Sequence, residues 1–273
     1  MSDVPSIKLN DNNKIPQIGL GLWKNTDEAE FINAFNAAHE NGYRHFDTAQ
    51  AYSNEQMLGK AWTDKKVKRQ DIFITTKINI KNFTKSKLAD SFSESLEKLQ
   101  TDYVDLLLLH FPVPILRNNA WEELVKIQKN GQAKSIGVSN YTVRHLKELL
   151  KITDIVPAIN QVELHVFLQQ PDLIDYCRSK NIQIEAYSPI AQAKILDNPV
   201  IQKIADKHSK SYVQIMLKWL LENDLVIIPK SVTPKRIKEN IDLFSFKLDE
   251  EDLSELKKLD LNKRFCWSPV HVP

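Results

Sequence analysis

The sequence predicts an α/β protein built as a closed (β/α)8 TIM barrel. Short apolar runs alternate with longer segments of helical periodicity along almost the whole chain. The runs at 71–76, 103–109 and 225–228 are mostly apolar, which is typical of strands covered on both faces. No linker rich in Pro or Gly divides the chain, and 273 residues is the size of one such barrel. An open, doubly wound sheet is the second interpretation.

The chain opens with a predicted β-hairpin. Two extended pieces at 6–10 and 14–17 flank the turn sequence Asp11-Asn12-Asn13. An apolar strand at 18–23 follows, and helical periodicity predicts a helix at 27–40. Further strands are predicted at 45–47, 72–77, 104–109, 134–138, 158–162, 183–187 and 226–229, and helices at 54–63, 85–99, 119–129, 142–151, 170–180, 200–208, 211–222 and 234–241. We expect one domain over residues 1–273, with an extra C-terminal helix and a tail after the barrel.

Composition and charge exclude several classes of function. The 37 basic and 35 acidic residues leave a net charge of +2, which gives no electrostatic basis for binding nucleic acid or an anionic membrane. No apolar run is long enough to span a bilayer, and the N-terminus lacks the features of a secretory signal. Cys177 and Cys266 lack metal-ligand spacing, which favours free thiols in a reducing compartment. We therefore expect a cytoplasmic protein.

Polar side chains stand at the carboxyl ends of the predicted strands, where barrel enzymes place their chemistry. The second strand ends at Asp47, and Tyr52 follows in a loop before a helix expected to begin near Asn54, a favoured N-cap residue. The third strand ends at Lys77 and the fourth at His110. The later strands end at Ser139-Asn140, Asn160-Gln161, Tyr187-Ser188 and Lys230-Ser231. Each of these residues alone has a structural explanation. Polar or ionisable side chains at the ends of seven successive strands, however, predict that they meet in one site at the carboxyl-terminal mouth of the barrel.

Asp47, Tyr52, Lys77 and His110 together suit the reduction of a carbonyl group. Hydride delivery to a carbonyl carbon creates an alkoxide, which needs a proton from a positioned acid. Tyr52 would be that acid, and the Lys77 cation, held by Asp47, would lower the tyrosine pKa from about 10. His110 would donate a hydrogen bond to the carbonyl oxygen. A Schiff-base aldolase that uses Lys77 alone is an alternative, and the set is a poor metal-ligand shell.

The usual nucleotide-binding motifs are missing from the sequence. Gly19-x-Gly21 lacks the third glycine of a dinucleotide fingerprint, and no phosphate-binding loop occurs in a chain with six glycines. Glycines in this strand would instead let backbone or ligand approach closely. We expect Gly21, Trp23 and Asp47 to be among the cofactor contacts. A bound nucleotide would have to be held in another way.

Three ordered motifs resemble the signatures of the aldo-keto reductase superfamily. The first lies at 42–59 and contains Gly-Tyr-Arg-His-Phe-Asp-Thr-Ala, Glu55 and Leu58-Gly59; the second is Ser-Ile-Gly-Val-Ser-Asn-Tyr at 135–141. The third, at 228–240, begins Ile-Pro-Lys-Ser-Val-Thr-Pro-Lys-Arg. The resemblance covers essentially the whole chain and is greatest to the microbial diketogluconate reductase, methylglyoxal reductase and prostaglandin F synthase type. It implies a (β/α)8 barrel that uses NADP(H) without a Rossmann domain.

The resemblance also implies roles for individual residues. The four residues assigned above to carbonyl reduction match the catalytic tetrad. Ser139, Asn140 and Gln161 match the residues that hold the nicotinamide carboxamide, and Tyr187, followed by Ser188, matches the ring that stacks on the nicotinamide. The adenosine-phosphate segment is matched by Lys230, Ser231, Val232, Thr233, Arg236, Glu239 and Asn240. The cations of this segment suit a 2′-phosphate, so NADP(H) is favoured over NAD(H).

Departures from close relatives concern the substrate pocket and one cofactor loop. Asn79 stands where relatives carry an aromatic residue, Phe111 where they usually have Trp, and Ala193 where Gly is usual. The expected pocket contains Trp23, Tyr52, Asn79, His110, Phe111 and Trp267. We expect it to be more polar on its Asn79 side.

The sequence thus predicts a monomeric, NADPH-dependent reductase of small aldehydes, ketoaldehydes or α-diketones. The alternative from another class of protein is a redox-sensing subunit that binds NADP(H) with negligible turnover. We expect neither a nucleic-acid partner nor a membrane partner.

Overall fold

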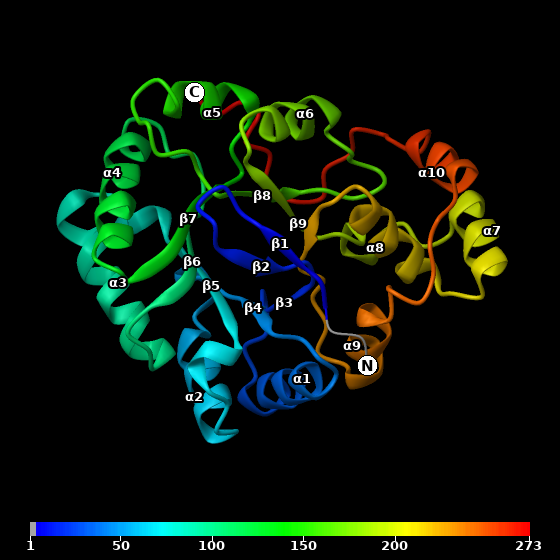
Figure 1. Ribbon diagram of the computed structural model, residues 1–273, viewed down its shortest axis with the longest axis horizontal. Coiled ribbons are helices and arrows are strands. Elements are labelled where there is room, and N and C mark those ends of the chain that lie inside the picture. Colours follow the sequence, from blue (N-terminus) through cyan, green and yellow to red (C-terminus); the bar gives the residue numbers. More distant parts are fainter. Residues whose placement is uncertain (1–3) are drawn as a thin grey trace.

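The computed structural model describes residues 4–273 and contains, within them, an eight-stranded parallel sheet wound around a central axis (Figure 1). The strands are neighbours in chain order: β3 (Gly19–Gly21), β4 (His45–Asp47), β5 (Phe73–Ile78), β6 (Val104–Leu109), β7 (Ala133–Ser139), β8 (Ile159–Glu163), β9 (Gln183–Tyr187) and β10 (Val226–Ile227). Parallel bridges join Ile18 to Ile227 and Gly21 to Lys230, so the first strand also meets the last. The strands form a nearly closed barrel, which confirms the TIM-barrel prediction over the open sheet.

Helices surround the barrel on its outside (Figure 1). They are α1 (Glu28–Glu40), α2 (Glu55–Asp64), α3 (Lys85–Leu99), α4 (Leu116–Lys129), α5 (Val143–Leu149), α6 (Pro171–Ser179), α7 (Pro199–His208), α8 (Tyr212–Glu222), α9 (Pro234–Ile241) and α10 (Glu250–Lys257). Short 3-10 helices lie at Gln50–Tyr52, Arg69–Asp71, Ile80–Asn82 and Ala191–Ala193. The predicted bounds of α3 and α9 are confirmed, whereas α4 begins three residues before its predicted start at 119. The predicted extra C-terminal helix is α10.

Two apolar cores stabilise the fold. The larger core lies between the sheet and the helices and includes Phe31 of α1, Phe92 of α3 and Trp121 of α4. A second core, which we call the lower interior, consists of Leu9, Ile15, Phe73, Leu106, Leu108, Ala158, Ile159 and Val226. Two of its members come from the predicted hairpin, β1 (Ser6–Lys8) paired with β2 (Lys14–Pro16). The hairpin lies across one end of the barrel (Figure 1) and fills that end with apolar side chains.

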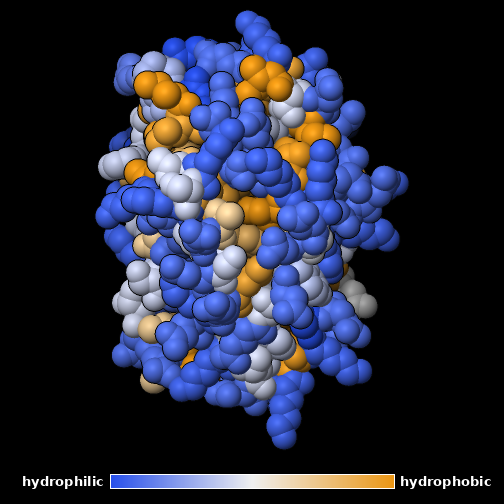
Figure 2. Space-filling model, turned by 90° about the vertical axis from the view of Figure 1, so that its left-hand side faces the viewer, coloured by the Kyte–Doolittle hydropathy of each residue, from blue (hydrophilic) through white to orange (hydrophobic). Residues whose placement is uncertain are grey.

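The outer surface is polar where the helices face solvent. Figure 2 shows the flank that carries α3 and α4, which is covered mainly by hydrophilic residues with scattered apolar patches. Lys85 of α3 lies 3.3 Å from Glu122 of α4 on this flank. The helices are therefore amphipathic, with apolar faces against the sheet. Within residues 4–273, no helix has the length and apolar character that crossing a membrane requires.

Asn54 stands at the N-cap position of α2, but its side chain does not cap the helix as predicted. Its Oδ1 accepts a hydrogen bond from Thr48 Oγ1 at 2.6 Å, and its Nδ2 donates to the carbonyls of Leu22 at 2.8 Å and Asn25 at 3.0 Å. The amide is fully buried, so these loop groups would lose their partners without it. Asn54 therefore joins the loops after β3 and β4, which carry parts of the predicted site.

Candidate active site

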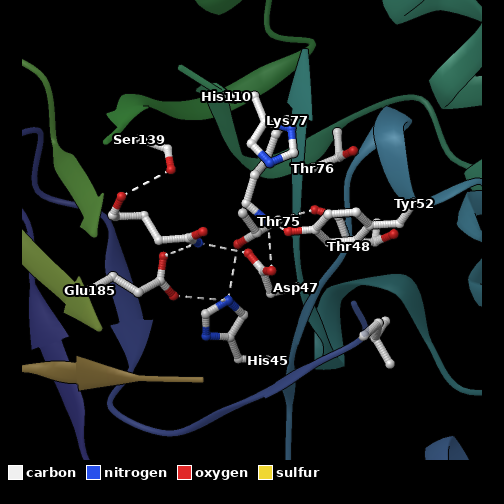
Figure 3. A network of polar contacts seen from close by, with 12 residues as sticks. His45, Asp47, Thr48, Tyr52, Thr75, Thr76, Lys77, His110, Ser139 and Glu185 are labelled. Carbon is white, nitrogen blue, oxygen red and sulfur yellow. Dashed lines mark hydrogen bonds and ion pairs between the residues drawn. The ribbon is translucent and has the colours of Figure 1, made fainter. Parts of the chain in front are cut away.

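Three of the predicted catalytic residues form one chain of contacts at the carboxyl ends of β4 and β5 (Figure 3). Lys77 Nζ lies 2.6 Å from Asp47 Oδ1 and 3.4 Å from the Tyr52 hydroxyl, and it also donates to the Thr48 carbonyl at 2.9 Å. Lys77 is completely buried and Asp47 nearly so. The ammonium group is thus fixed between a carboxylate and the phenol by three acceptors, which uses all of its hydrogens.

Burial and charge act in opposite directions on the Lys77–Asp47 pair. Burial alone would lower the pKa of Lys77, but the negative charges of Asp47 and the other acidic groups nearby outweigh it and raise that pKa. Burial raises the pKa of Asp47, while the Lys77 charge and hydrogen bonds from Lys77 and Gln161 oppose the rise. Since a buried charge is costly without its partner, we treat the two residues as one ion pair.

The pKa of Tyr52 moves in the direction opposite to our prediction. Burial raises it, although the Lys77 charge and hydrogen bond act to lower it. The predicted net lowering by Lys77 is therefore wrong, because the cost of forming a phenolate in this enclosed position exceeds the benefit of the lysine charge. Tyr52 consequently holds its proton at neutral pH, and Lys77 would favour the phenolate only as that proton leaves.

His110 follows β6 and lies against Tyr52. The two rings meet edge to face with centroids 5.6 Å apart. Burial and the Lys77 charge lower the pKa of His110 to about 3, so the imidazole is neutral at physiological pH. A neutral imidazole has one N–H to donate. Tyr52 and His110 therefore offer two different hydrogen-bond donors at the same part of the mouth.

Four residues predicted to hold the nicotinamide lie beside one another. Ser139 Oγ donates to the Gln161 carbonyl at 2.9 Å, and Asn140 Nδ2 contacts Ser139 Oγ at 3.0 Å and the His110 carbonyl at 3.1 Å. The Tyr187 hydroxyl donates to Asn140 Oδ1 at 2.7 Å, which fixes its ring. Asn140 adopts a left-handed backbone conformation with φ 65°, a region that asparagine tolerates well. The structure thus joins the ends of β7, β8 and β9 around one side of the mouth.

The segment predicted to bind the adenosine phosphate leads from β10 into α9. Ser231 Oγ accepts a hydrogen bond from Thr233 N at 3.2 Å, which shapes the turn before the helix. Lys230, Thr233 and Arg236 are exposed, whereas Ser231 and Asn240 are buried and Val232 and Glu239 are half-buried. Among residues 4–273, neither cation forms an ion pair with a carboxylate, so both remain available to an anion.

The remaining predicted cofactor contacts lie close to these groups. Gly21 pairs with Asp47 of β4 and bridges to Lys230, and a Cβ at Gly21 would lie 2.8 Å from the Ile228 carbonyl oxygen. Only glycine permits this approach of the first and last strands. Ser188 has φ 48°, and its Oγ lies 3.4 Å from Cys266 Sγ of the tail.

Aromatic residues form part of the rim of the predicted substrate pocket. The rings of Phe111 and Trp267 meet edge to face with centroids 5.9 Å apart, although Trp267 is 76% exposed. Trp23 is 42% exposed and carries the Lys24 ammonium over its ring. Asn79 is half-buried, and its side-chain oxygen accepts a hydrogen bond from Lys81 N, so this oxygen is already engaged within its own loop. Ala193 is exposed with φ 57°, a backbone conformation that favours the glycine usual in relatives.

Sequence reasoning missed two buried residues beneath the tetrad. Glu185 Oε2 accepts a hydrogen bond from Gln161 Nε2 at 2.8 Å, and its Oε1 lies 3.6 Å from His45 Nε2 (Figure 3). His45 Nε2 also contacts Thr75 Oγ1 at 2.9 Å. Both missed residues precede a predicted site residue by two positions on the same strand, so strand alternation places them on the same face. We call the set His45, Asp47, Thr75, Lys77, Gln161 and Glu185 the interior polar network.

Asn160, which the strand-end pattern also included, faces away from the site. Its side chain exchanges hydrogen bonds with the Tyr141 backbone and lies 3.9 Å from Cys177 Sγ. It is adjacent in sequence to Gln161, and alternation turns the two side chains to opposite faces of β8. Asn160 therefore fixes the loop after β7 from outside the barrel.

Comparison with known proteins gives consistent matches along the chain. Residues 17–261 match the model of the Aldo/keto reductase family. The chain is 45% identical over 273 residues to the Escherichia coli O157:H7 protein named methylglyoxal reductase DkgA, covering 98% of each sequence. A solved aldo-keto reductase from a Medee basin deep-sea metagenome library has a TM-score of 0.94 at 41% identity, covering 98% of this chain and 100% of that one. A Bombyx mori aldo-keto reductase in complex with NADP has a TM-score of 0.91 at 34% identity, covering 97% and 95%.

Proposed function

Because the chain belongs to the aldo/keto reductase family of oxidoreductases that act on carbonyl groups, we propose that it reduces small aldehydes, ketoaldehydes and α-diketones with NADPH. The observation that carries this proposal is the contact chain from Asp47 through Lys77 to Tyr52 beside the His110 ring. It supplies a proton donor, a buried cation and a second hydrogen-bond donor at one place. The similarity to a relative named for methylglyoxal supports the choice of a small dicarbonyl.

Tyr52 acts as the proton donor in this proposal. Its raised pKa keeps the proton on the phenol until a carbonyl oxygen gains negative charge. As the proton leaves, the Lys77 ammonium 3.4 Å away stabilises the phenolate, and Asp47 keeps that ammonium in place. His110 is neutral and donates its N–H to the same carbonyl oxygen, which orients the substrate.

The residues at the mouth fit an NADP(H) cofactor, which would supply the hydride when bound. Ser139, Asn140 and Gln161 offer amide and hydroxyl groups that suit a carboxamide, and Tyr187 offers a ring fixed by Asn140. Lys230 and Arg236 are exposed, and Arg236 stands in the first turn of α9, where a helix N-terminus also favours an anion. These two cations would bind the 2′-phosphate that distinguishes NADPH from NADH.

The state of Lys77 argues against the Schiff-base aldolase. A Schiff base requires a neutral lysine nitrogen with a free lone pair. The pKa of Lys77 is raised rather than lowered, and its ammonium hydrogens are engaged by Asp47, Thr48 and Tyr52. Lys77 is therefore held as a cation, which suits a proton-transfer site.

The test is oxidation of NADPH by the purified protein with methylglyoxal and a panel of small aldehydes and diketones. Tyr52→Phe should lower kcat by about 10²–10⁴-fold, because it removes the proton donor. NADPH affinity, measured by fluorescence titration, should stay within about twofold of wild type, since the mutation removes no predicted cofactor contact. Tyr141→Phe is the matched control: this tyrosine is also buried, and its hydroxyl has no partner within residues 4–273.

The outcomes separate the alternatives. Turnover by wild type and Tyr141→Phe but not by Tyr52→Phe supports the reductase. NADPH binding without turnover of any panel member favours the redox-sensing subunit instead. Failure of the wild type to bind NADPH contradicts the proposal, and covalent trapping of Lys77 by borohydride with a carbonyl would favour the aldolase.

A further inference from the structure

The Gln161 amide is held between two carboxyl groups. Its Nε2 lies 2.8 Å from Asp47 Oδ2 and 2.8 Å from Glu185 Oε2. An amide nitrogen has two hydrogens, and each is directed to one carboxyl oxygen. Rotating the amide by 180° would place its oxygen against these acceptors. The two carboxyl groups therefore select one orientation of Gln161, with its amide oxygen turned away from both of them.

The interior polar network contains two acids but one buried cation. Lys77 is paired with Asp47 at 2.6 Å, and no second lysine or arginine contacts Glu185 among residues 4–273. The titratable groups around Glu185 are His45 on β4, Asp47 at the end of that strand, and Lys77 on β5. Burial and the nearby Asp47 charge both disfavour a second anion at Glu185, and together they raise the pKa of Glu185 to about 8. His45 cannot compensate, because burial and the Lys77 charge lower its own pKa to about 3.

The two oxygens of Glu185 differ in their hydrogen bonding, and the difference indicates which oxygen would carry the proton of the neutral acid. Oε2 accepts from Gln161, whereas Oε1 is buried and has no hydrogen-bond partner within the described residues. His45 Nε2 lies 3.6 Å from Oε1. A proton on Oε1 makes Glu185 a neutral acid that still accepts from Gln161 through Oε2. The network then contains one cation and one anion, which is the balanced state for a buried site.

We propose that Glu185 is a positioning residue of this active site: as a neutral acid it holds the Gln161 amide so that the amide oxygen faces the cofactor carboxamide, and it leaves Lys77 to Asp47 alone. This rests on the proposed function, because Gln161 is the predicted carboxamide contact. Glu185 touches neither substrate nor cofactor in this role. Its effect is on the affinity for NADPH and on the alignment of the nicotinamide, and it donates no proton to the carbonyl.

Two substitutions test the proposal through NADPH affinity. Glu185→Leu removes one of the two acceptors that orient the Gln161 amide and leaves Asp47 alone to hold it. The Kd for NADPH should rise at least about fivefold, the worth of one net hydrogen bond, and kcat should fall while KM for the carbonyl stays unchanged. Glu185→Gln keeps an uncharged acceptor of the same shape. Its Kd for NADPH and its kcat should therefore remain within about twofold of wild type at neutral pH.

The pH profile separates positioning from a merely structural role. In wild type, NADPH affinity should weaken as pH rises through about 8, because an ionised Glu185 would compete with Asp47 for Lys77. Glu185→Gln should lack that weakening. Glu55→Gln is the matched control, since Glu55 is also a buried, hydrogen-bonded carboxyl but contacts Thr76 and Ser95 instead of the network. It should keep the wild-type profile.

The results that overturn the proposal are specific. A folded Glu185→Leu with wild-type affinity for NADPH overturns it, and so does a Glu185→Gln protein whose pH profile equals that of wild type. The second result decides the question even when Glu185→Leu fails to fold. If the wild type binds and oxidises NADPH while either result is found, only the role of Glu185 fails. If the wild type does not bind NADPH, the proposed function fails first.

Discussion

The two ends of the barrel interior are filled by the same strands but with opposite chemistry. At the hairpin end, the lower interior is apolar, with residues such as Ile15, Leu106 and Val226. At the other end lies the interior polar network. β5 contributes to both, with Phe73 in the lower interior and Lys77 in the network. The position of a residue along its strand, rather than the strand to which it belongs, therefore determines whether it serves stability or chemistry.

The difference has an energetic consequence. Shortening a side chain in an apolar interior costs the transfer free energy of the removed atoms and leaves a cavity. A polar interior is stable only when each group keeps its partner, since an unpaired buried charge costs much more than a cavity. In the interior polar network, Lys77 and Asp47 meet this condition through their 2.6 Å contact and Gln161 through its two bonds, whereas Glu185 Oε1 has no partner within the described residues. A change that removes a partner within the network should therefore affect both stability and activity, and a truncation in the lower interior should affect stability alone.

Removing the buried cation should have the largest effect. Lys77→Met leaves Asp47 buried without its partner, so we expect a loss of about 3–5 kcal/mol in the free energy of unfolding. We also expect kcat/KM to fall at least about a hundredfold, because no charge would stabilise the Tyr52 phenolate. Urea unfolding and NADPH oxidation measure the two effects. Lys218→Met, a buried lysine paired with Glu222 on the outer helix α8, is the control and should retain activity. A stable, active Lys77→Met protein would contradict the ion-pair assignment.

A truncation in the lower interior should reduce stability without reducing activity. Leu106→Ala removes a fully buried side chain, which should lower the free energy of unfolding by about 2–5 kcal/mol. Activity of the folded fraction, measured well below the melting temperature, should stay within about twofold of wild type, because the site lies at the opposite end of the strands. Leu261→Ala is the control, since that leucine is 61% exposed and should contribute little to stability. A large loss of kcat in Leu106→Ala would show that the two ends are coupled.

Much of this contrast was predictable from the sequence. The alternation of apolar strands with helices predicted the barrel, and the polar residues at strand ends predicted the placement of Asp47, Lys77 and His110 at one mouth. Strand bounds were less predictable: β10 covers only Val226–Ile227 of the predicted 226–229, because the barrel closes there through isolated bridges rather than a long ladder. Such closure depends on strands distant in sequence.

The buried residues beneath the catalytic tetrad were harder to predict from the sequence. Glu185 lies within a strand between Ile184 and Ala186, where a single polar residue has no evident purpose until Gln161 of the neighbouring strand is placed beside it. The pKa of Tyr52 was mispredicted for a related reason. The sequence identified the nearby lysine but not the extent of burial, and burial determined the direction of the shift. Both misses concern the environment of a residue rather than its identity.

The stability of the network should depend on pH through Glu185. Its pKa is about 8 in the folded protein and near 4.5 when unfolded, so the folded state binds more protons between these values. Stability from this residue is complete below the unfolded pKa and is lost as pH rises through the folded pKa, by at most about 1.4 kcal/mol per pH unit. Glu185→Gln cannot titrate at this position, so wild type should lose stability relative to Glu185→Gln as the pH rises from about 5 to about 8. A difference independent of pH would show that Glu185 is ionised in the fold.

The cofactor segment should give a smaller and more selective effect. Arg236→Ala should raise the Kd for NADPH about tenfold, which is the loss of one charge-assisted hydrogen bond, and leave the Kd for NADH unchanged. Lys235→Ala is the matched control, because Lys235 is an exposed cation on the same helix and is not among the predicted cofactor contacts. Equal losses for NADPH and NADH in Arg236→Ala would place this arginine elsewhere than at the 2′-phosphate. Fluorescence titration with both nucleotides gives the comparison.

The rim aromatic Trp267 should have the smallest effect, because it lies outside both interior regions. It is 76% exposed and meets Phe111 edge to face at 5.9 Å, so its removal creates no cavity and leaves no charge unpaired. Trp267→Ala should therefore keep the melting temperature and the affinity for NADPH, and should raise KM for the carbonyl about threefold, as expected for the loss of one exposed aromatic contact. Val270→Ala, in the same tail and also exposed, should leave KM unchanged. A change in NADPH affinity in Trp267→Ala would instead assign the tail to the cofactor, and an unchanged KM would exclude Trp267 from the substrate pocket.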